Sequence, residues 1–191
     1  ICYPSTMDQK AIDLIIKCTR AKEIVRREEI QSLWSGYGSI DRYFLKGGNY
    51  SSVVVKHVKI PTESDHPRGW NTSISQQRKI KSYHVETSWY YGLALQCPKE
   101  ARIPHCLAHE HHEDEILVVL EDLDGVGYPR RINSVNWYQI EVVSSWLATF
   151  HAYYMNIEAP DLWRTGTYWH LETRPEELEA LPPGPLKEKA G

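Results

Sequence analysis

The sequence has no long apolar run, no long basic run and no paired cysteines. Its longest apolar stretches, such as Ile116–Leu120, are a few residues long, far short of the roughly 20 residues of a membrane-spanning helix. The formal net charge is -3, so charge gives no reason to expect nucleic-acid binding. The 4 cysteines form no C-x-x-C pair. That pattern favours reduced structural thiols in a cytoplasmic protein over a disulfide framework or a zinc site.

Composition and patterning indicate an α+β protein dominated by an antiparallel sheet. Apolar residues make up 41% and charged residues 25% of the chain, as in globular proteins of one domain or a little more. The spacing of apolar residues predicts helices at Met7–Cys18, Ser75–Leu95 and Val135–Tyr154, and a short one at Pro175–Leu181. Strands are predicted as a pair between Glu23 and Leu45, at Ser51–Val58, at Arg102–Ala108 and at Ile116–Leu120, with a charged turn at His109–Glu115.

Lys56 stands in the valine-rich strand Ser51–Val58. Because side chains alternate along a strand, Lys56 and Val54 project from the same face and His57 from the opposite one. A lysine on an apolar inner face is costly unless an opposite charge neutralises it. The alternative is a Lys56 side chain that points to solvent near the end of the strand.

Glu86 is the candidate partner of Lys56. It lies near the middle of the long helix that follows the strand, between Val85 and Trp89 and away from an evident polar stripe. A strand lysine held by a helix glutamate is the arrangement with which protein kinases aim an ammonium group at nucleotide phosphates. A glutamate on the solvent side of an amphipathic helix is the alternative.

A glycine-containing turn, Ser35–Ser39, precedes the lysine strand. Gly36 and Gly38 permit close backbone approach, and the N–H groups along the turn, including those of Tyr37 and Ser39, can bind phosphate oxygens. The sequence has neither the Walker pattern G-x-x-x-x-G-K-[ST] nor a complete G-x-G-x-x-G. The turn is therefore a candidate phosphate-binding loop because of its position before the strand lysine, and not because it matches a motif.

Glu121, Asp122 and Leu123 form a polar break directly after the apolar strand Ile116–Leu120. In a two-lobed kinase this position is the hinge, whose backbone N–H and C=O groups pair with the edge of the adenine. The helix that follows, Val135–Tyr154, has the length and the apolar face to begin a second lobe. A plain acidic turn is the alternative.

Six segments in order resemble the ecdysteroid-kinase-like branch of the aminoglycoside phosphotransferase and choline kinase superfamily. The resemblance runs from about Met7 to about Leu181 and depends on order, since no single motif is specific. The segments are Ser35–Ser39, Val53–His57, His66–Asn71, Ser82–Glu86 with Trp89 and Tyr90, Val119–Asp124, and Leu147–Ala152.

The resemblance implies a protein-kinase-like fold and transfer of the ATP γ-phosphoryl group to a hydroxyl of a small molecule. Residues 1–22 would form a leader and helix, 23–121 the nucleotide-binding small lobe, and 122–191 the hinge and the start of a helical large lobe. Lys56 would contact the α- and β-phosphates and Glu86 would hold it, while Val54 would cover the adenine and Glu121–Leu123 would form the hinge. ATP, magnesium and a small hydroxylated acceptor are the implied ligands, with neither nucleic acid nor a membrane as partner.

The sequence departs from that family after the hinge. Members continue to an H-G-D-x-x-x-x-N catalytic loop and then to a magnesium-binding Asp, and this chain has neither pattern after Asp124. Phosphoryl transfer needs both, so we expect magnesium ligands only beyond Gly191 and a chain that is inactive as it stands. A nucleotide-binding or interaction module without catalysis stays an alternative. An unrelated α+β binding domain, in which Lys56 and Glu86 are incidental, is another.

Four histidines lie among acidic residues before the last predicted strand. They are His105, His109, His111 and His112, beside Glu110, Glu113, Asp114 and Glu115. Nitrogen and oxygen ligands at this density can hold a transition metal. A solvated turn between two strands is the alternative, and we assign no metal site.

The predicted helix Val135–Tyr154 carries more large apolar residues than a free surface helix needs. We expect its apolar side chains to be exposed in this chain and to promote self-association or poor solubility.

Overall fold

The computed structural model describes residues 9–33, 36–60, 73–112 and 114–165, together with residues 170, 174, 175 and 179. The chain divides into two compact units: Ile1–Pro61 with Tyr90–Asn156, and Thr62–Trp89 with Ile157–Gly191. Ser35 of the glycine turn, the segment His66–Asn71 and most of the predicted helix Pro175–Leu181 lie outside the described residues.

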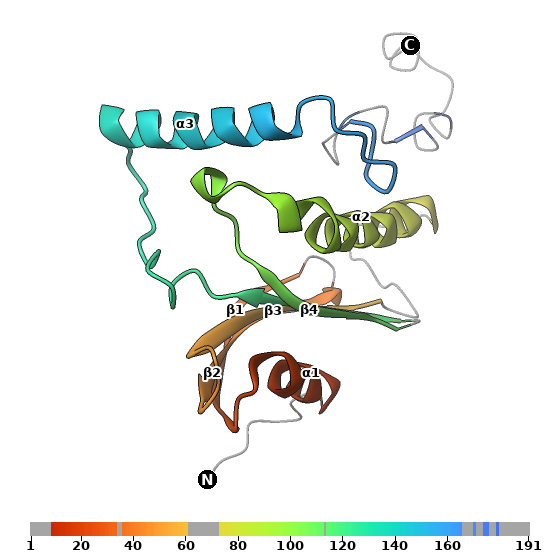
Figure 1. Ribbon diagram of the computed structural model, residues 1–191. Helices are drawn as coiled ribbons and strands as arrows, with labels where there is room; N and C mark the ends of the chain where they lie inside the picture. Colours follow the sequence, from red (N-terminus) through yellow and green to blue (C-terminus); the bar gives the residue numbers. More distant parts are fainter. Residues whose placement is uncertain are drawn as a thin grey trace. The chain divides into compact units, whose positions relative to one another are not determined.

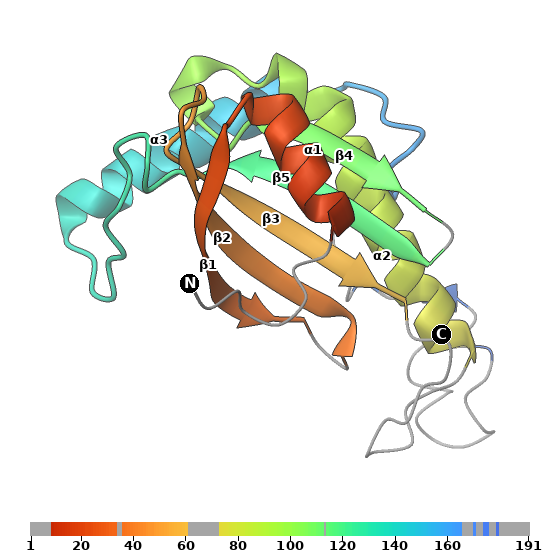
Figure 2. The ribbon, with the colours of Figure 1, turned by 90° about the horizontal axis from the view of Figure 1, so that it is seen from below.

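A five-stranded antiparallel sheet forms the centre of the first unit (Figure 1), and its strands lie in the order β1-β2-β3-β5-β4 (Figure 2). The strands are β1 Glu23–Ser32, β2 Gly38–Lys46, β3 Ser52–Lys59, β4 Cys106–His111 and β5 Glu115–Glu121. The most apolar strands, β3 and β5, pair with each other inside the sheet, because a strand covered on both faces requires apolar side chains on both. The expected α+β class is confirmed.

The prediction for β4 was wrong at both ends. Pro104 has no N–H for a strand ladder, and the strand begins only at Cys106. At the other end, His109–His111 continue the strand and pair with Ile116–Val118 of β5. Polar side chains are tolerated there because β4 is an edge strand with solvent on one side. The turn between β4 and β5 is therefore shorter than expected.

Helix α1, Gln9–Thr19, packs on one face of the sheet and lies across β5 and β4 (Figure 2). Its apolar stripe is buried, as predicted, because it faces the alternate apolar residues of the strands. The shared core consists of Ala11, Leu14, Ile15, Ala21, Tyr43, Leu45, Val53, Val55, Leu117 and Val119.

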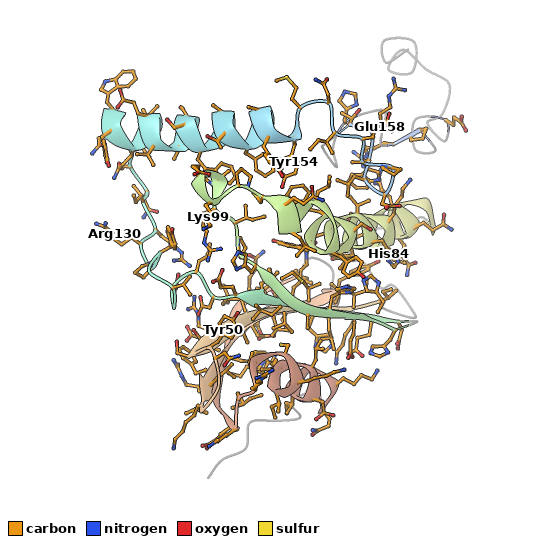
Figure 3. All side chains as sticks on the ribbon, in the orientation of Figure 1. Tyr50, His84, Lys99, Arg130, Tyr154 and Glu158 are labelled. Carbon is orange, nitrogen blue, oxygen red and sulfur yellow. The ribbon has the colours of Figure 1, made fainter. Side chains whose placement is uncertain are left out.

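Helix α3, Trp137–Tyr154, begins with a capping box: the Asn136 side chain accepts from the Gln139 N–H, and the Gln139 side chain accepts from the Asn136 N–H. The cap explains why the helix starts two residues after the predicted Val135. The helix is held to the segment before β4 by two hydrogen bonds. Trp146 Nε1 donates to the Arg102 carbonyl at 3.0 Å, and the Tyr154 hydroxyl, which points out of α3 toward that segment, donates to Leu93 at 2.9 Å (Figure 3).

Helix α2, Ser73–Tyr91, belongs to the second unit as far as Trp89. The predicted helix extended to Leu95. Instead, Gly92 takes a non-helical conformation, and a short 3-10 helix, η2 (Leu93–Gln96), follows it. No helix in the described part of the chain is long and apolar enough to cross a membrane.

Candidate functional site

Lys56 and Val54 lie on the face of the sheet opposite α1. In the strand ladder Lys56 pairs with Ile40 of β2 and with Val118 of β5, and paired residues share a face. The alternate residues of β3, such as Val55, are buried in the core with α1. Lys56 and Val54 are each half-buried. The sequence prediction that these two side chains share one face is confirmed.

His57 points to the α1 face, as predicted. Its ring contacts the Glu115 carboxylate, and both side chains are buried. The same carboxylate accepts a hydrogen bond of 2.7 Å from Lys10 of α1. This group attaches α1 to β3 and β5, on the side away from Lys56.

The predicted hinge and the glycine turn lie at opposite ends of β3. Glu121 pairs with Val53 at one end, and Gly38 pairs with Val58 at the other. At ~3.4 Å per residue, these two positions are roughly 17 Å apart along the strand, with Lys56 between them. The register therefore gives the order hinge, Val54, Lys56 and glycine turn.

The two glycines of the turn have different surroundings. Both have positive φ, +73° at Gly36 and +113° at Gly38. A Cβ at Gly38 would lie 2.0 Å from the His57 carbonyl oxygen, whereas a Cβ at Gly36 would meet nothing within 4 Å. Gly38 is thus required for the close approach of β2 to β3, while Gly36 leaves open space at its Cα where a ligand can approach.

The other two predicted turn residues are held within the sheet. Tyr37 is buried, and its carbonyl accepts from the Lys59 N–H at 2.9 Å. The Ser39 hydroxyl donates to Asp41 at 2.6 Å, and Arg27 donates to the same carboxylate at 3.0 Å. The Ser39 side chain is therefore engaged in the sheet, and any phosphate contact by these residues would come from their backbone.

Glu121, the first predicted hinge residue, directs its buried carboxylate at the segment before β4. Arg102 Nη2 donates to it at 2.6 Å and the His105 N–H at 3.3 Å. The Arg102 carbonyl in turn accepts from Trp146 of α3. Glu121 is thus the first member of a short series of hydrogen bonds from β5 to α3.

Asp122, the second hinge residue, is tied to β2 and β3. Arg42 donates to its two oxygens, Nε at 2.8 Å and Nη2 at 3.2 Å, and the Ser52 hydroxyl donates at 2.6 Å. The N–H of Asp124 donates to it at 3.1 Å. The carboxylate is buried, so these donors replace the water it loses.

The backbone after Asp122 folds into a tight turn. The Leu123 carbonyl accepts from the Tyr128 N–H at 2.9 Å and from Val126 at 3.3 Å, and the Asp122 carbonyl accepts from Gly125 at 3.0 Å. The acidic stretch is therefore an ion-paired turn, which Glu121 and Asp122 join to the start of β3.

Opposite charges surround Arg42 and Asp124. Arg42 donates to Asp124 at 2.6 Å, and Arg131 donates to the same carboxylate. The hydrogen bond from Arg131, together with the charge of Arg42, holds the pKa of Asp124 below its usual value. Burial works to lower the pKa of Arg42, but its bond to Asp122 and the two carboxylate charges outweigh burial and raise it.

The sequence did not point to Arg42 or Ser52 as site residues. They are 80 and 70 positions from Asp122, so no local pattern connects them. The one available signal was the alternation along β2, which places Arg42 on the same face as Val54.

Glu86 is half-buried in α2. It belongs to the second unit and Lys56 to the first. The ion pair between them stays a prediction.

The histidines before β5 do not converge on one point, because they contact different partners. His105 lies beside Arg102, His109 makes edge contacts with the rings of Tyr91 and His111, and His112 contacts Glu110. No group of three or more metal-ligating side chains occurs among the residues the structure describes, and Glu113 lies outside them.

Three cysteines, Cys18, Cys97 and Cys106, lie in the part of the chain that the structure describes, and none of them forms a disulfide. Burial raises the pKa of Cys18 to about 11 and also raises the pKa of Cys106. Such thiols carry little reactive thiolate at neutral pH.

Large apolar side chains of α3 are exposed, as expected from the sequence. Trp137 is 80% exposed. The others are Tyr138, Ile140, Val142, Val143, Leu147 and Tyr153. Self-association through them stays a prediction.

Comparison with known proteins finds structural likenesses to solved structures of WbdD. A co-crystal structure of WbdD with the kinase inhibitor LY294002 matches 59% of this chain at 19% identity, with a TM-score of 0.32. A structure of the bifunctional kinase-methyltransferase WbdD matches 59% at 20% identity, also with a TM-score of 0.32. The matches cover 22% and 24% of those chains, so this chain corresponds to less than a quarter of their length. No protein-family model and no curated protein matches the sequence.

Proposed function

We propose that this chain supplies the nucleotide-binding part of an ATP-dependent phosphotransferase that acts on a hydroxyl of a small molecule. The proposal includes the finer assignment to the ecdysteroid-kinase-like branch, which the order of the sequence segments suggested, and a cytoplasmic location, which the cysteine pattern suggested.

The order of groups along β3 is the observation that carries the proposal. The polar segment Glu121–Leu123, the apolar Val54, the cationic Lys56 and the glycine turn follow one another along β3, with Val54 and Lys56 on the same face. An adenine nucleotide presents an apolar base with a polar edge at one end and anionic phosphates at the other. The order of polar, apolar and cationic groups along β3 thus matches the order of base edge, base and phosphates in the nucleotide.

The residues at each position fit their part of ATP. Half-buried Val54 offers apolar surface for the base, and the ammonium group of Lys56 offers positive charge for the phosphates. The open, left-handed Gly36 allows backbone approach to phosphate oxygens. ATP would supply the γ-phosphoryl group, and Glu86 would orient Lys56.

The residues that the structure describes include no group of three or more potential metal ligands. We therefore derive no step through the metal. The chain also lacks the catalytic-loop pattern, and this observation favours a second candidate function, a nucleotide-binding or interaction module without catalysis. Transfer of the labelled γ-phosphoryl group of ATP to a panel of hydroxylated acceptors, measured in a protein extended past Gly191, separates the two candidates, because the 191-residue chain is expected to be inactive under both.

Thermal stability in the presence of nucleotides tests the proposal. ATP at about 100 times its dissociation constant stabilises a protein by about 2.7 kcal/mol, which raises the melting temperature by roughly 5–11 °C for a chain of this size. We expect ATP to raise the melting temperature and AMP at equal concentration to raise it less, because AMP lacks the β-phosphate, one of the two phosphates assigned to Lys56. No shift with any adenine nucleotide would reject nucleotide binding.

A further inference from the structure

We infer that Asp122 is a positioning residue, which fixes the Glu121–Leu123 segment against β2 and β3 so that its backbone meets the base, and that its carboxylate does not touch the ligand. The inference rests on the proposed function, in which the backbone of this segment pairs with the base, and it adds a positioning role for the Asp122 side chain.

The carboxylate of Asp122 has no acceptor site left for a ligand. A carboxylate offers about four lone-pair directions. Four donors occupy them: Arg42 Nε, Arg42 Nη2, the Ser52 hydroxyl and the Asp124 N–H, at 2.6 to 3.2 Å. The side chain is 4% exposed. A nucleotide could bond to it only by displacing one of these donors in a buried place.

The donors come from the strands that carry the rest of the site. Arg42 pairs with Val54 in the ladder, and Ser52 is the first residue of β3, the strand of Lys56. Because both donors hold one carboxylate, the segment after β5 cannot shift relative to Val54 without breaking several hydrogen bonds.

Two further contacts tighten the same attachment. Arg42 also reaches Asp124, which Arg131 holds from the other side. At Gly125, a Cβ would lie 3.0 Å from the Ser52 hydroxyl and 3.4 Å from the Asp122 carbonyl, so the turn packs closely on the start of β3. These contacts thus hold the turn both where it begins, at Asp122, and farther along, at Asp124 and Gly125.

The backbone of the segment is the part left for recognition. The Asp122 and Leu123 carbonyls are engaged within the turn, and the Glu121 N–H donates to the His105 carbonyl at 2.8 Å. The Glu121 side chain is engaged with Arg102. Hydrogen bonding to a planar base edge depends on the position of the remaining backbone groups to within a fraction of an ångström. Loosening Asp122 should therefore weaken binding of the base and leave binding of the phosphates unchanged.

Asp122→Asn in the full 191-residue chain tests this, with Glu23→Gln as the matched control. Glu23 forms an exposed ion pair with Lys46 on the same sheet, at 3.9 Å. Titration calorimetry with ATP and with inorganic tripolyphosphate separates base binding from phosphate binding. We expect Asp122→Asn to weaken ATP binding by about tenfold to a hundredfold, and to change tripolyphosphate binding by no more than about twofold. Glu23→Gln should change neither.

Hydrogen exchange of the amides in residues 123–128 gives a readout that does not need a ligand. Asp122→Asn should speed their exchange, while the exchange of β3 stays as in the wild type. If Asp122→Asn does not fold, Ser52→Ala, which removes one of the four donors, should give the same two effects at smaller size.

The outcomes separate the two proposals. A wild type that binds neither ATP nor tripolyphosphate rejects the proposed function, and with it the role in base binding, whereas the exchange result still decides whether Asp122 fixes the turn. Equal losses of ATP and tripolyphosphate binding, or unchanged ATP binding with unchanged exchange, would overturn the positioning role.

Discussion

Ile15 should be the residue of α1 whose truncation most weakens the attachment of that helix to the sheet. Its side chain is 0% exposed and lies in the core with Val55 and Leu117. Ile15→Ala removes buried methyl and methylene groups and leaves a cavity between α1 and the strands. Changes of this kind cost about 2–5 kcal/mol.

Ile16→Ala is the matched control, because it makes the same substitution in the next residue of the same helix. The Ile16 side chain is 38% exposed, so its truncation removes less buried surface. Alanine also has the better helix propensity. We expect a loss smaller than about 1 kcal/mol.

Urea denaturation followed by far-UV circular dichroism measures both effects. With a loss of about 3 kcal/mol, Ile15→Ala should also lower the melting temperature by roughly 6–12 °C. The affinity for ATP at low temperature should stay unchanged, since α1 covers the face opposite Lys56. Equal destabilisation by Ile15→Ala and Ile16→Ala would refute the orientation of α1 described above.

Acid should weaken the attachment of the turn after β5, because the folded-state pKa of Asp124 lies below its ordinary value of 3.8. The stabilisation is complete above that ordinary value and is lost as the pH falls through the lower folded-state pKa. Asp124→Asn should therefore reduce the pH dependence of unfolding between about pH 2 and pH 5, and an unchanged profile would contradict this. Separately, sedimentation velocity should show concentration-dependent self-association that Trp137→Ser reduces. A monomer at all concentrations would count against a role for the exposed side chains of α3.

The sequence predicted those parts of the fold that depend on neighbouring residues. The valines of β3 and the apolar run of β5 indicated strands, and alternation placed Lys56 and His57 on opposite faces. The start of α3 was close to its prediction, and the Asn136 cap accounts for the difference. In each case the physical cause lies within a few residues of the feature it determines.

The parts that could not be predicted depend on contacts between distant residues. Gly38 looked like a phosphate-binding glycine, but its need for a bare Cα comes from the His57 carbonyl of β3, and this depends on strand register. Asp122 looked like part of an acidic hinge or turn. The positioning role proposed for it depends on Arg42 and Ser52, which are 80 and 70 positions away in the sequence.

The central claim is that Lys56 contacts the phosphates of a bound nucleotide, and a pair of lysine substitutions in one strand tests it most directly. Lys59 ends β3 on the opposite face and is exposed, so Lys59→Met is the control for Lys56→Met. In titration calorimetry with ATP, Lys56→Met should weaken binding at least about tenfold, equivalent to about 1.4 kcal/mol, while Lys59→Met should keep the wild-type affinity. Equal ATP affinity in the wild type and in Lys56→Met would contradict the account.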